Sequence, residues 1–398
     1  MSKQEKKCDV ALSTLYFGLN YGSILTAFGL YKAVESYGMK PALLSKPNKL
    51  WTDHYANPES IANLFINKFC NVLTCDDDNM ADLNELADQF LVGSDVIWSY
   101  NVVGKDTDDL YFLPYVRPEK KKIAYAPCFG GSFQPKDGTL NQYVKLMRRF
   151  SGIAVKEDKE AEILRNSFGI EPAMVIDPVF LCDKQCYVDC AEQAAAKHVE
   201  SDDTFIFSSI ENCDSRKRAF LLRGNEILVK NHCSELRNFI DINRYPESKA
   251  LLDLDVAYHI RVEDYLYYLM HSEFVITDNY YTMCMALIFE KPFVVLVNED
   301  FPEIYRFESI LKPLGLEERL VVLQEDLKKK EYLFRMPIRW NLVNEKLQEL
   351  KSASEEWLKA QLGVKTEEAS AETPAEAEVS AEAAAPVEAA PAEAPKEE

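Results

Sequence analysis

The sequence predicts an α/β protein with two Rossmann-like domains, a cleft between them and a disordered C-terminal tail. Short apolar runs typical of buried strands alternate with helical segments through most of the chain, which indicates parallel sheets. Residues 274–297 show this most clearly, with an expected strand at Phe274–Thr277, a helix at Met283–Phe289 and a strand at Phe293–Val297. Asp278 follows the first of these strands, at the edge where open α/β sheets bind ligands.

The first expected domain covers residues 1–185 and begins with another strand–helix–strand pattern. The strands are expected at Val10–Ser13 and Ala42–Leu44, and the apolar period of Ser23–Tyr37 predicts the helix between them. Later elements repeat the alternation and indicate a doubly wound sheet. They are a strand ending before Asp95, strands at Ile123–Ala126, Gly152–Val155 and Met174–Asp177, and a helix at Lys159–Ser167.

Two glycine-containing turns of this domain are candidate anion sites. In Gly18–Ser23 the glycines allow close backbone approach and Ser23 can cap the following helix, so an anion could bind the free N–H groups. The spacing is not GxGxxG, and as a dinucleotide signal it is weak. Phe129–Ser132 contains a glycine pair that suits a tight turn or an anion nest.

The rest of the chain is expected to form a helical linker at 186–203, a second α/β domain at 204–335 and a helix at 336–364 that packs back on the body. Within it we expect strands at Thr204–Ile210 and Phe239–Ile242 and helices at Val262–His271, Arg306–Leu311 and Trp340–Leu362. Residues 365–398 contain mainly Ala, Glu and Pro, a composition that cannot bury a core, and are expected to be disordered.

The charge excludes some partners. A net charge of −20 argues against nucleic acid and anionic lipid as ligands, since both require clustered Lys and Arg. No apolar run approaches the roughly 20 residues of a membrane span, and the N-terminus lacks the apolar core of a signal peptide. We therefore expect a cytoplasmic protein without a transmembrane segment.

The ten cysteines are scattered without a CxxC pair, which fits reduced thiols in the core. Cys182, Cys186 and Cys190 share one helical stripe, so a metal site and simple packing are both possible there. Packing thiols are much the commoner case, and we predict no metal site.

Several motifs together resemble the polysaccharide pyruvyl transferase family, whose members resemble two-domain glycosyltransferases of the B type. The similarity runs from about Val10 to Leu362, and the order and spacing of the motifs make it specific. The matching blocks are Asn20–Leu25, Val92–Trp98, Tyr111–Leu113, Lys122–Gly130, Ile176–Leu181, Thr277–Asp278, Lys291–Phe293, Arg306–Phe307 and Leu314–Leu316.

This resemblance implies transfer of a pyruvyl group from phosphoenolpyruvate to sugar hydroxyls of a surface-glycan precursor. The acceptor would be a sugar or a lipid-linked oligosaccharide. Phosphoenolpyruvate would be a co-substrate, and no cofactor is expected. The oligomeric state is not predicted. The reaction needs cations or N–H groups for the carboxylate and phosphate, an acid for the methylene carbon and a base for the sugar hydroxyl.

Candidate site residues follow from these demands and from the matched motifs. The catalytic candidates are Asp278, Tyr281 and Asp95. The substrate-binding candidates are Asn20, Tyr21, Gly22, Ser23, Ser94, Lys156, His259, Arg261, Asn279 and Arg306.

Each candidate also has a structural interpretation. Asp95 and Asp278 can cap the turn or helix that follows them, Arg306 can pair with a surface carboxylate, and Asp177 before Pro178 can be a turn acid. His271 lies at the end of an expected helix and fits a helix-end role.

The sequence departs from the family motif at the opening of the predicted second-domain site. Tyr281 stands where the family has a catalytic or phosphate-binding His, and Thr282 replaces a Gly. Lys156 replaces an Arg and keeps the charge without bidentate recognition. His259 or Arg261 would stand in for the missing His if they lie near the site.

These departures leave other functions open. The same fold can bind a sugar, or transfer one from a nucleotide sugar, without using phosphoenolpyruvate. A pure interaction protein, tethered by its acidic tail, is a third class.

Overall fold

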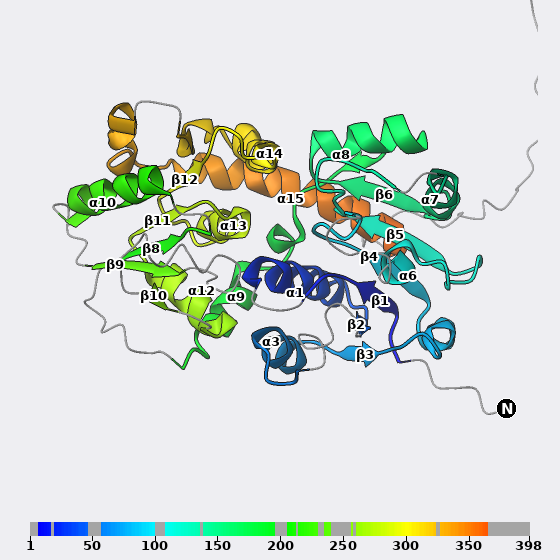
Figure 1. Cartoon of the computed structure of the whole chain (residues 1–398). Coiled ribbons are helices and arrows are strands. Elements are labelled where there is room, and N and C mark those ends of the chain that lie inside the picture. Colours follow the sequence, from blue (N-terminus) through cyan, green and yellow to red (C-terminus); the bar gives the residue numbers. More distant parts are fainter. Residues whose placement is uncertain are drawn as a thin grey trace, which may run out of the picture. The chain divides into compact units, whose positions relative to one another are not determined.

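The computed structural model describes residues 7–16, 20–46, 57–99, 108–135, 138–195, 205–211, 214–229, 235–239, 256–257, 260–323 and 327–364. Within these residues the chain forms mixed α/β structure with two parallel sheets, as the sequence predicted (Figure 1). The predicted tail, 365–398, lies outside the described residues. The helices of the described part include none that is both long and apolar enough to cross a membrane.

The first sheet has seven strands in the order β3-β2-β1-β4-β5-β6-β7, and all its paired strands are parallel. The chain leaves β1 toward β2 on one side and returns to β4 on the other, so the topological switch point lies between β1 and β4. Ligands of doubly wound sheets bind outside the carboxyl ends of the strands at such a point. The strands are β1 Val10–Ser13, β2 Pro41–Ser45, β3 Val72–Thr74, β4 Gln89–Val92, β5 Lys121–Tyr125, β6 Gly152–Val155 and β7 Ala173–Met174.

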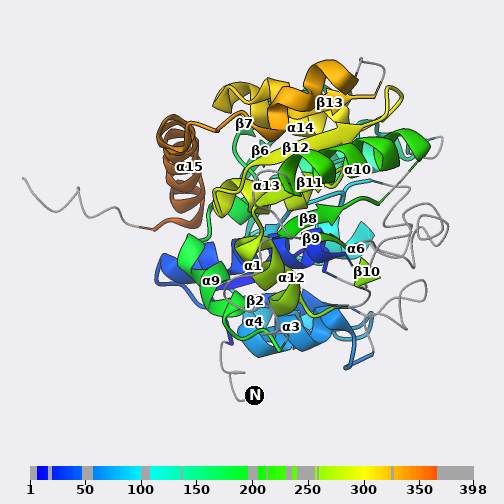
Figure 2. The ribbon, with the colours of Figure 1, turned by 90° about the vertical axis from the view of Figure 1, so that its left-hand side faces the viewer.

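The second sheet has six strands in the order β10-β9-β8-β11-β12-β13, again with parallel pairing throughout. Its switch point lies between β8 and β11, whose carboxyl ends lead into Ile210 and Asp278. Figure 2 turns these strands toward the viewer. The strands are β8 Phe205–Ser209, β9 Glu235–Phe239, β10 Val256–Ala257, β11 Phe274–Thr277, β12 Phe293–Val297 and β13 Leu320–Val322.

Helices connect the strands and cover the sheets. The α-helices are α1 Tyr21–Ser36, α3 Ile61–Phe69, α4 Leu83–Leu86, α6 Asp108–Phe112, α7 Leu140–Met147, α8 Asp158–Ile163, α9 Lys184–Ala191, α10 Ser215–Val229, α12 Val262–His271, α13 Tyr280–Ile288, α14 Ile304–Leu314 and α15 Trp340–Leu362. Short 3-10 or π turns are η1 Met80–Asp82, η3 Leu164–Phe168, η4 Pro178–Phe180, η5 Glu317–Arg319 and η6 Leu327–Phe334.

Central strands and two helices were predicted to the residue. β1, β6, β11, β12, α12 and α15 have the expected bounds. All four of these strands are wholly or almost wholly buried, because helices cover both faces of a parallel sheet, and this produces unbroken apolar runs.

Other predicted elements have different bounds in the structure, among them the helix expected at Arg306–Leu311, which spans Ile304–Leu314. Three of the differences have a visible cause or outcome. β7 ends at Met174 instead of Asp177, because the Asp177 side chain caps η4 by accepting from the Val179 N–H at 3.1 Å. β9 ends at Phe239, where the predicted strand began, and residues 240–242 lie outside the described part. The helix predicted from Met283 starts at Tyr280, since Asn279 caps it.

An apolar core joins the two sheets. One continuous cluster of buried side chains includes Leu12 of β1, Phe28 of α1, Met283 of α13 and Val275 of β11. The two sheets therefore share a core through α1 and α13, which brings the loops at their carboxyl ends into contact.

The last helix, α15, contacts the first sheet although it follows the second. Its Ser354 Oγ accepts from the Ile176 N–H at 3.0 Å, and the Gln89 side chain donates to the Leu362 carbonyl at 3.0 Å. In Figure 1 this helix, coloured orange, extends from the second-sheet elements toward β4 and β5.

Candidate functional site

The turn after β4 holds Ser94 and Asp95 at the switch point of the first sheet. Gly93 makes this turn possible, because its φ is 147° and a Cβ there would lie 1.9 Å from the Tyr125 carbonyl oxygen. Asp95 itself has a φ of 71°, which is uncommon outside glycine. The turn therefore fixes the Asp95 carboxylate at the carboxyl edge of the sheet, where it is 5% exposed.

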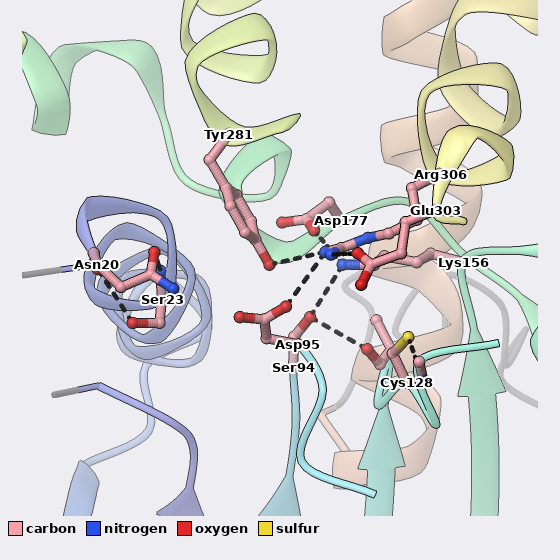
Figure 3. A network of polar contacts seen from close by, with 12 residues as sticks. Asn20, Ser23, Ser94, Asp95, Cys128, Lys156, Asp177, Tyr281, Glu303 and Arg306 are labelled. Atoms are coloured by element: carbon pink, nitrogen blue, oxygen red, sulfur yellow. Dashed lines mark hydrogen bonds and ion pairs between the residues drawn. The ribbon is translucent and has the colours of Figure 1, made fainter. Parts of the chain in front are cut away.

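Arg306 of α14 reaches this carboxylate from the second half of the chain. Its Nη2 donates to Asp95 Oδ1 at 3.1 Å, and its Nη1 donates to Glu303 Oε2 at 2.9 Å (Figure 3). Its Nε lies 3.6 Å from Glu157 Oε1. The guanidinium is buried and pairs with buried Asp95 as well as with the partly exposed Glu303, so Arg306 is more than the partner of a surface carboxylate.

Lys156 follows β6 and is the second buried cation of the site. Its Nζ lies 2.5 Å from Asp177 Oδ2 and 3.5 Å from Ser94 Oγ. Asp177 is thus both the turn acid that the sequence suggested and the counter-ion of Lys156. Nearby carboxylates, with Asp177 first among them, raise the pKa of Lys156 well above its usual value although burial opposes this, so its charge is secure.

Tyr280 and Tyr281, at the start of α13, place their rings against both cations. The Arg306 guanidinium carbon is 4.8 Å from the Tyr280 ring centroid, and Lys156 Nζ is 5.6 Å from that of Tyr281. Such contacts favour a cation over the ring face. The Tyr281 hydroxyl accepts from Arg306 Nη2 at 3.4 Å, and burial raises its pKa well above the ordinary value, so it remains a neutral phenol.

The Tyr281 ring also lies on the first turn of α1. A Cβ at Gly22 would come within 2.0 Å of Tyr281 Cδ2, so only glycine fits at this position. The helix start predicted as an anion site is therefore in contact with the Tyr281 ring.

Glu157, next to Lys156, carries the carboxyl group that the sequence analysis left out of the site. Its side chain is fully buried, and neither oxygen has a hydrogen-bond partner among the described residues. Burial raises its pKa to about 7, even though Lys156 and Arg306 lower it. The signal that could have identified Glu157 is its place directly after a predicted strand end.

The Phe129–Ser132 turn does form a nest of N–H groups, but a carboxylate of this chain occupies it. Glu160 Oε2 accepts from the Phe129 N–H at 2.7 Å, and its Oε1 accepts from the Gly131 N–H at 3.0 Å. The Tyr305 hydroxyl donates to the same Oε1 at 3.1 Å. Glu160 is fully buried and so serves as an internal ligand of this turn.

The start of α1 is held mainly by local contacts. Asn20 caps the helix by accepting from the Ser23 N–H at 3.3 Å, and the Ser23 hydroxyl donates back to the Asn20 carbonyl at 3.0 Å. Figure 3 shows both residues on the far side of Tyr281 from Lys156. The Tyr21 hydroxyl donates to the Ile260 carbonyl at 2.8 Å, and its ring stacks on Tyr265, so Tyr21 binds second-sheet elements.

Asp278 is not the cap of α13. Asn279 takes that role by accepting from the N–H groups of Tyr281 and Thr282 at 3.0 Å each, so the capping interpretation of Asp278 is wrong. Asp278 pairs instead with Lys217 at 2.6 Å and accepts from the Glu211 N–H at 2.7 Å. These contacts tie β11 to the neighbouring β8 loop and to α10.

The remaining candidates lie elsewhere. Arg261 pairs with buried Glu263 at 3.1 Å, and the same carboxylate takes Lys68 at 2.9 Å. His259 lies outside the described residues. His271 contacts the Tyr267 carbonyl one turn earlier in its own helix.

Cys182, Cys186 and Cys190 are free thiols, and the described part of the chain contains no group of three or more His, Cys, Asp or Glu placed to hold a metal. Of the residues proposed to meet in the site, Asp95, Ser94, Lys156, Tyr281 and Arg306 do converge.

The two parallel α/β sheets define a fold class, that of the B-type glycosyltransferases. A glycosyltransferase from Rickettsia africae ESF-5 is similar in structure, with a TM-score of 0.52 at 12% identity over 90% of this chain and 97% of that chain. A UDP-GlcNAc 2-epimerase from Neisseria meningitidis, bound to UDP-GlcNAc, gives a TM-score of 0.55 at 11% identity over 89% and 99%. Identities this low show the fold alone.

The sequence gives the family. The family model for polysaccharide pyruvyl transferases matches residues 20–300, which is well over half of the chain. The chain belongs to the polysaccharide pyruvyl transferase family, as its motifs predicted. A comparison with curated proteins finds no match. Family and fold together indicate a transferase that modifies polysaccharide.

Proposed function

We propose that this protein transfers a pyruvyl group from phosphoenolpyruvate to sugar hydroxyls of a surface-glycan precursor. The observation that supports this most directly is the convergence of Lys156 and Arg306, two buried cations, beside Asp95 at the switch point of the first sheet. Phosphoenolpyruvate carries a carboxylate and a phosphate, and a pair of fixed cations is what its binding requires.

The cations hold carboxylates of the chain in the absence of substrate. Glu303, the most exposed partner of Arg306, has a side chain 35% exposed and is the contact that an incoming anion displaces at the lowest cost. Ser94 offers Lys156 only a long contact of 3.5 Å. Phosphoenolpyruvate would thus bind Arg306 in place of Glu303 and would bind Lys156 beside Ser94. Asp95 and Asp177 would keep the two cations in position.

The acceptor side of the site is assigned to Asp95 and the α1 start. A carboxylate can take the proton of a sugar hydroxyl, and Asn20 and Ser23 present polar groups opposite it (Figure 3). A sugar or a lipid-linked oligosaccharide in the cytoplasm is the acceptor this reaction requires. Phosphoenolpyruvate would be consumed as a co-substrate, without a further cofactor.

A second candidate is sugar binding, or sugar transfer from a nucleotide sugar, without phosphoenolpyruvate. The observation that favours it is that carboxylates of the chain already surround both cations: Asp95, Glu157, Asp177 and Glu303. Four acids against two bases disfavour a highly charged anion if all four remain ionised.

Phosphate release and calorimetry separate the two candidates. The protein is incubated with phosphoenolpyruvate and a panel of galactosyl, mannosyl and glucosaminyl acceptors. Acceptor-dependent phosphate release is expected, and Lys156→Gln should abolish it, whereas Lys184→Gln, which breaks an exposed pair with Glu290, should not. No release with any acceptor and no heat of phosphoenolpyruvate binding would refute pyruvyl transfer. Thermal stabilisation by UDP or GDP sugars would then support the second candidate.

A further inference from the structure

We propose that Glu157 is the proton donor of the transfer reaction, delivering a proton from its carboxyl group to the methylene carbon of phosphoenolpyruvate. This assignment rests on the proposed function. It adds a catalytic residue to which the sequence alone assigned no role.

The position of Glu157 is the first ground. It follows Lys156 at the end of β6, and its Oε1 lies 3.9 Å from Lys156 Nζ and 3.6 Å from Arg306 Nε. An anion held by these two cations is therefore held against the Glu157 carboxyl group. The carboxylate and phosphate of phosphoenolpyruvate are both attached to the carbon next to its methylene, so binding on the cations brings the methylene toward Glu157.

The second ground is that Glu157 has hydrogen-bonding capacity to spare. Among the described residues, neither of its oxygens has a hydrogen-bond partner, and the same holds for Arg306 Nε. Buried polar atoms are normally satisfied, and exceptions call for an explanation such as a catalytic role. Arg306 Nε lies 3.6 Å from Glu157 Oε1, so these groups without hydrogen bonds are close together, as expected where a polar ligand completes the site.

The other buried carboxylates are committed to fixed partners. Asp177 accepts from Lys156 and from the Val179 N–H. Glu160 fills the 129–131 nest, and Asp95 holds Arg306 at 3.1 Å. An acid that must give up a proton during the reaction cannot be bound to a cation so closely that it stays ionised. Glu157 is the member of the group that meets this condition.

Titratable groups of several elements surround Glu157. Lys156 precedes it, Arg306 and Tyr305 face it from α14, and Glu160 lies one turn along α8. Cys128 and Tyr280 contribute from the β5 loop and α13, and Asp177 from the turn before η4. The two cations lower the pKa of Glu157, while burial and the neighbouring carboxylates raise it to about 7, which suits proton transfer at neutral pH.

The proposed step balances as follows. The O–H bond of Glu157 breaks and a C–H bond forms at the methylene carbon, using the electron pair of the enol double bond. A sugar hydroxyl then adds to the adjacent carbon and passes its proton to the Asp95 carboxylate. Asp95 releases this proton to solvent, and the Glu157 carboxylate takes up a proton from solvent, which regenerates the acid. A second hydroxyl displaces the phosphate group, and its proton leaves with inorganic phosphate. The products are the cyclic ketal and phosphate.

The test compares Glu157→Gln with Glu171→Gln. Both changes remove one carboxylate that lies beside an arginine, but Glu171 pairs with Arg165 in an exposed contact outside the site. Initial rates of phosphate release are measured from pH 5.5 to 9 with phosphoenolpyruvate varied. Wild-type kcat should fall about tenfold per pH unit above pH ~7, because the acid must be protonated. Glu157→Gln should lower kcat by about 10²–10⁴-fold with KM nearly unchanged. Glu171→Gln should keep both kcat and the decline above pH ~7.

Each outcome is decisive. If wild type is active and Glu157→Gln retains kcat and the alkaline limb, Glu157 is not the acid, although pyruvyl transfer stands. If Glu157→Gln does not fold, as judged by circular dichroism, Glu157→Asp decides: a reduced kcat that still declines with pH supports the assignment, and an unchanged kcat refutes it. If wild type releases no phosphate with any acceptor, the proposed function itself fails, and the assignment falls with it.

Discussion

Arg306 Nη2 lies 3.1 Å from Asp95 Oδ1, and the two residues are 211 positions apart in the chain. Asp95 follows a strand of the first sheet, and Arg306 belongs to α14, between two strands of the second. Their side chains are only 5% and 8% exposed. This contact therefore joins the two sheets electrostatically at the place where the shared core brings their loops together.

Removal of one partner of this pair should cost more than removal of both. Arg306→Met leaves Asp95 and Glu157 buried without their cation, and loss of one member of a buried pair typically costs about 3–5 kcal/mol. The double variant Asp95→Asn, Arg306→Met should recover part of this loss. Urea unfolding of the four proteins at pH 7.5 measures the coupling. Strictly additive effects would show that the contact contributes no stability.

Gly22→Ala should destabilise the protein because of Tyr281. The new methyl group would come within 2.0 Å of Tyr281 Cδ2, and overpacking of this kind costs about 1–3 kcal/mol. In a Tyr281→Ala background the same change should be neutral or stabilising by up to ~1 kcal/mol, since Ala is the better helix residue. Thermal or urea unfolding, with and without Gly22→Ala in the wild-type and Tyr281→Ala backgrounds, measures the cost of the change in each. An equal cost in the two backgrounds would contradict the contact.

Asp278→Ala should act first on stability. It leaves Lys217, with a side chain only 3% exposed, without its partner at 2.6 Å, and a loss of about 3–5 kcal/mol is expected. The double variant Asp278→Asn, Lys217→Met should be more stable than Asp278→Ala. Its phosphate release per folded molecule then tests the catalytic role: activity within tenfold of wild type argues for a structural Asp278, and complete loss argues for a catalytic one.

The pH dependence of stability should contain a contribution from Glu157. Its pKa is raised to about 7 in the folded protein, so folding takes up a proton above the ordinary value of 4.5. Stability from this group is present at low pH and is lost as pH rises through about 7. Relative to Glu157→Gln, wild type should lose about 2 kcal/mol between pH 5.5 and pH 8, at 1.4 kcal/mol per unit. If the stability of wild type and of Glu157→Gln depends on pH in the same way, the pKa of Glu157 in the folded protein lies near 4.5.

The strands at the centre of both sheets could be predicted because a strand that is buried on both faces consists of consecutive apolar residues. β11 and β12 are unbroken apolar runs, and each ends where a polar residue meets the loops. Asp95 and Lys156 both follow strands of the first sheet, and the rule that carboxyl ends of parallel strands share an edge accounts for their proximity. The motif resemblance supplied Arg306, which lies on a helix and has no such positional signal.

The pairing of charges could not be predicted, because it depends on how elements pack. Asp278 and Asn279 are adjacent and both residue types cap helices, so the sequence cannot decide between them. The Phe129–Ser132 turn looks open in sequence, yet Glu160 of α8 fills it. The sequence assigned a role to Lys156 and none to the neighbouring Glu157. The lack of hydrogen bonds at the Glu157 carboxyl group is visible only in three dimensions.

The position of α15 has a consequence for the order of events during translation. The ribosome completes the strands of the first sheet long before it makes Trp340–Leu362, whose Trp357 lies near Tyr125 and whose Ser354 satisfies the Ile176 N–H. At about 5–20 residues per second, the delay is on the order of ten to thirty seconds. During that time the nascent first half exposes apolar surface that the last helix later helps to cover, so in this interval the chain needs protection from aggregation.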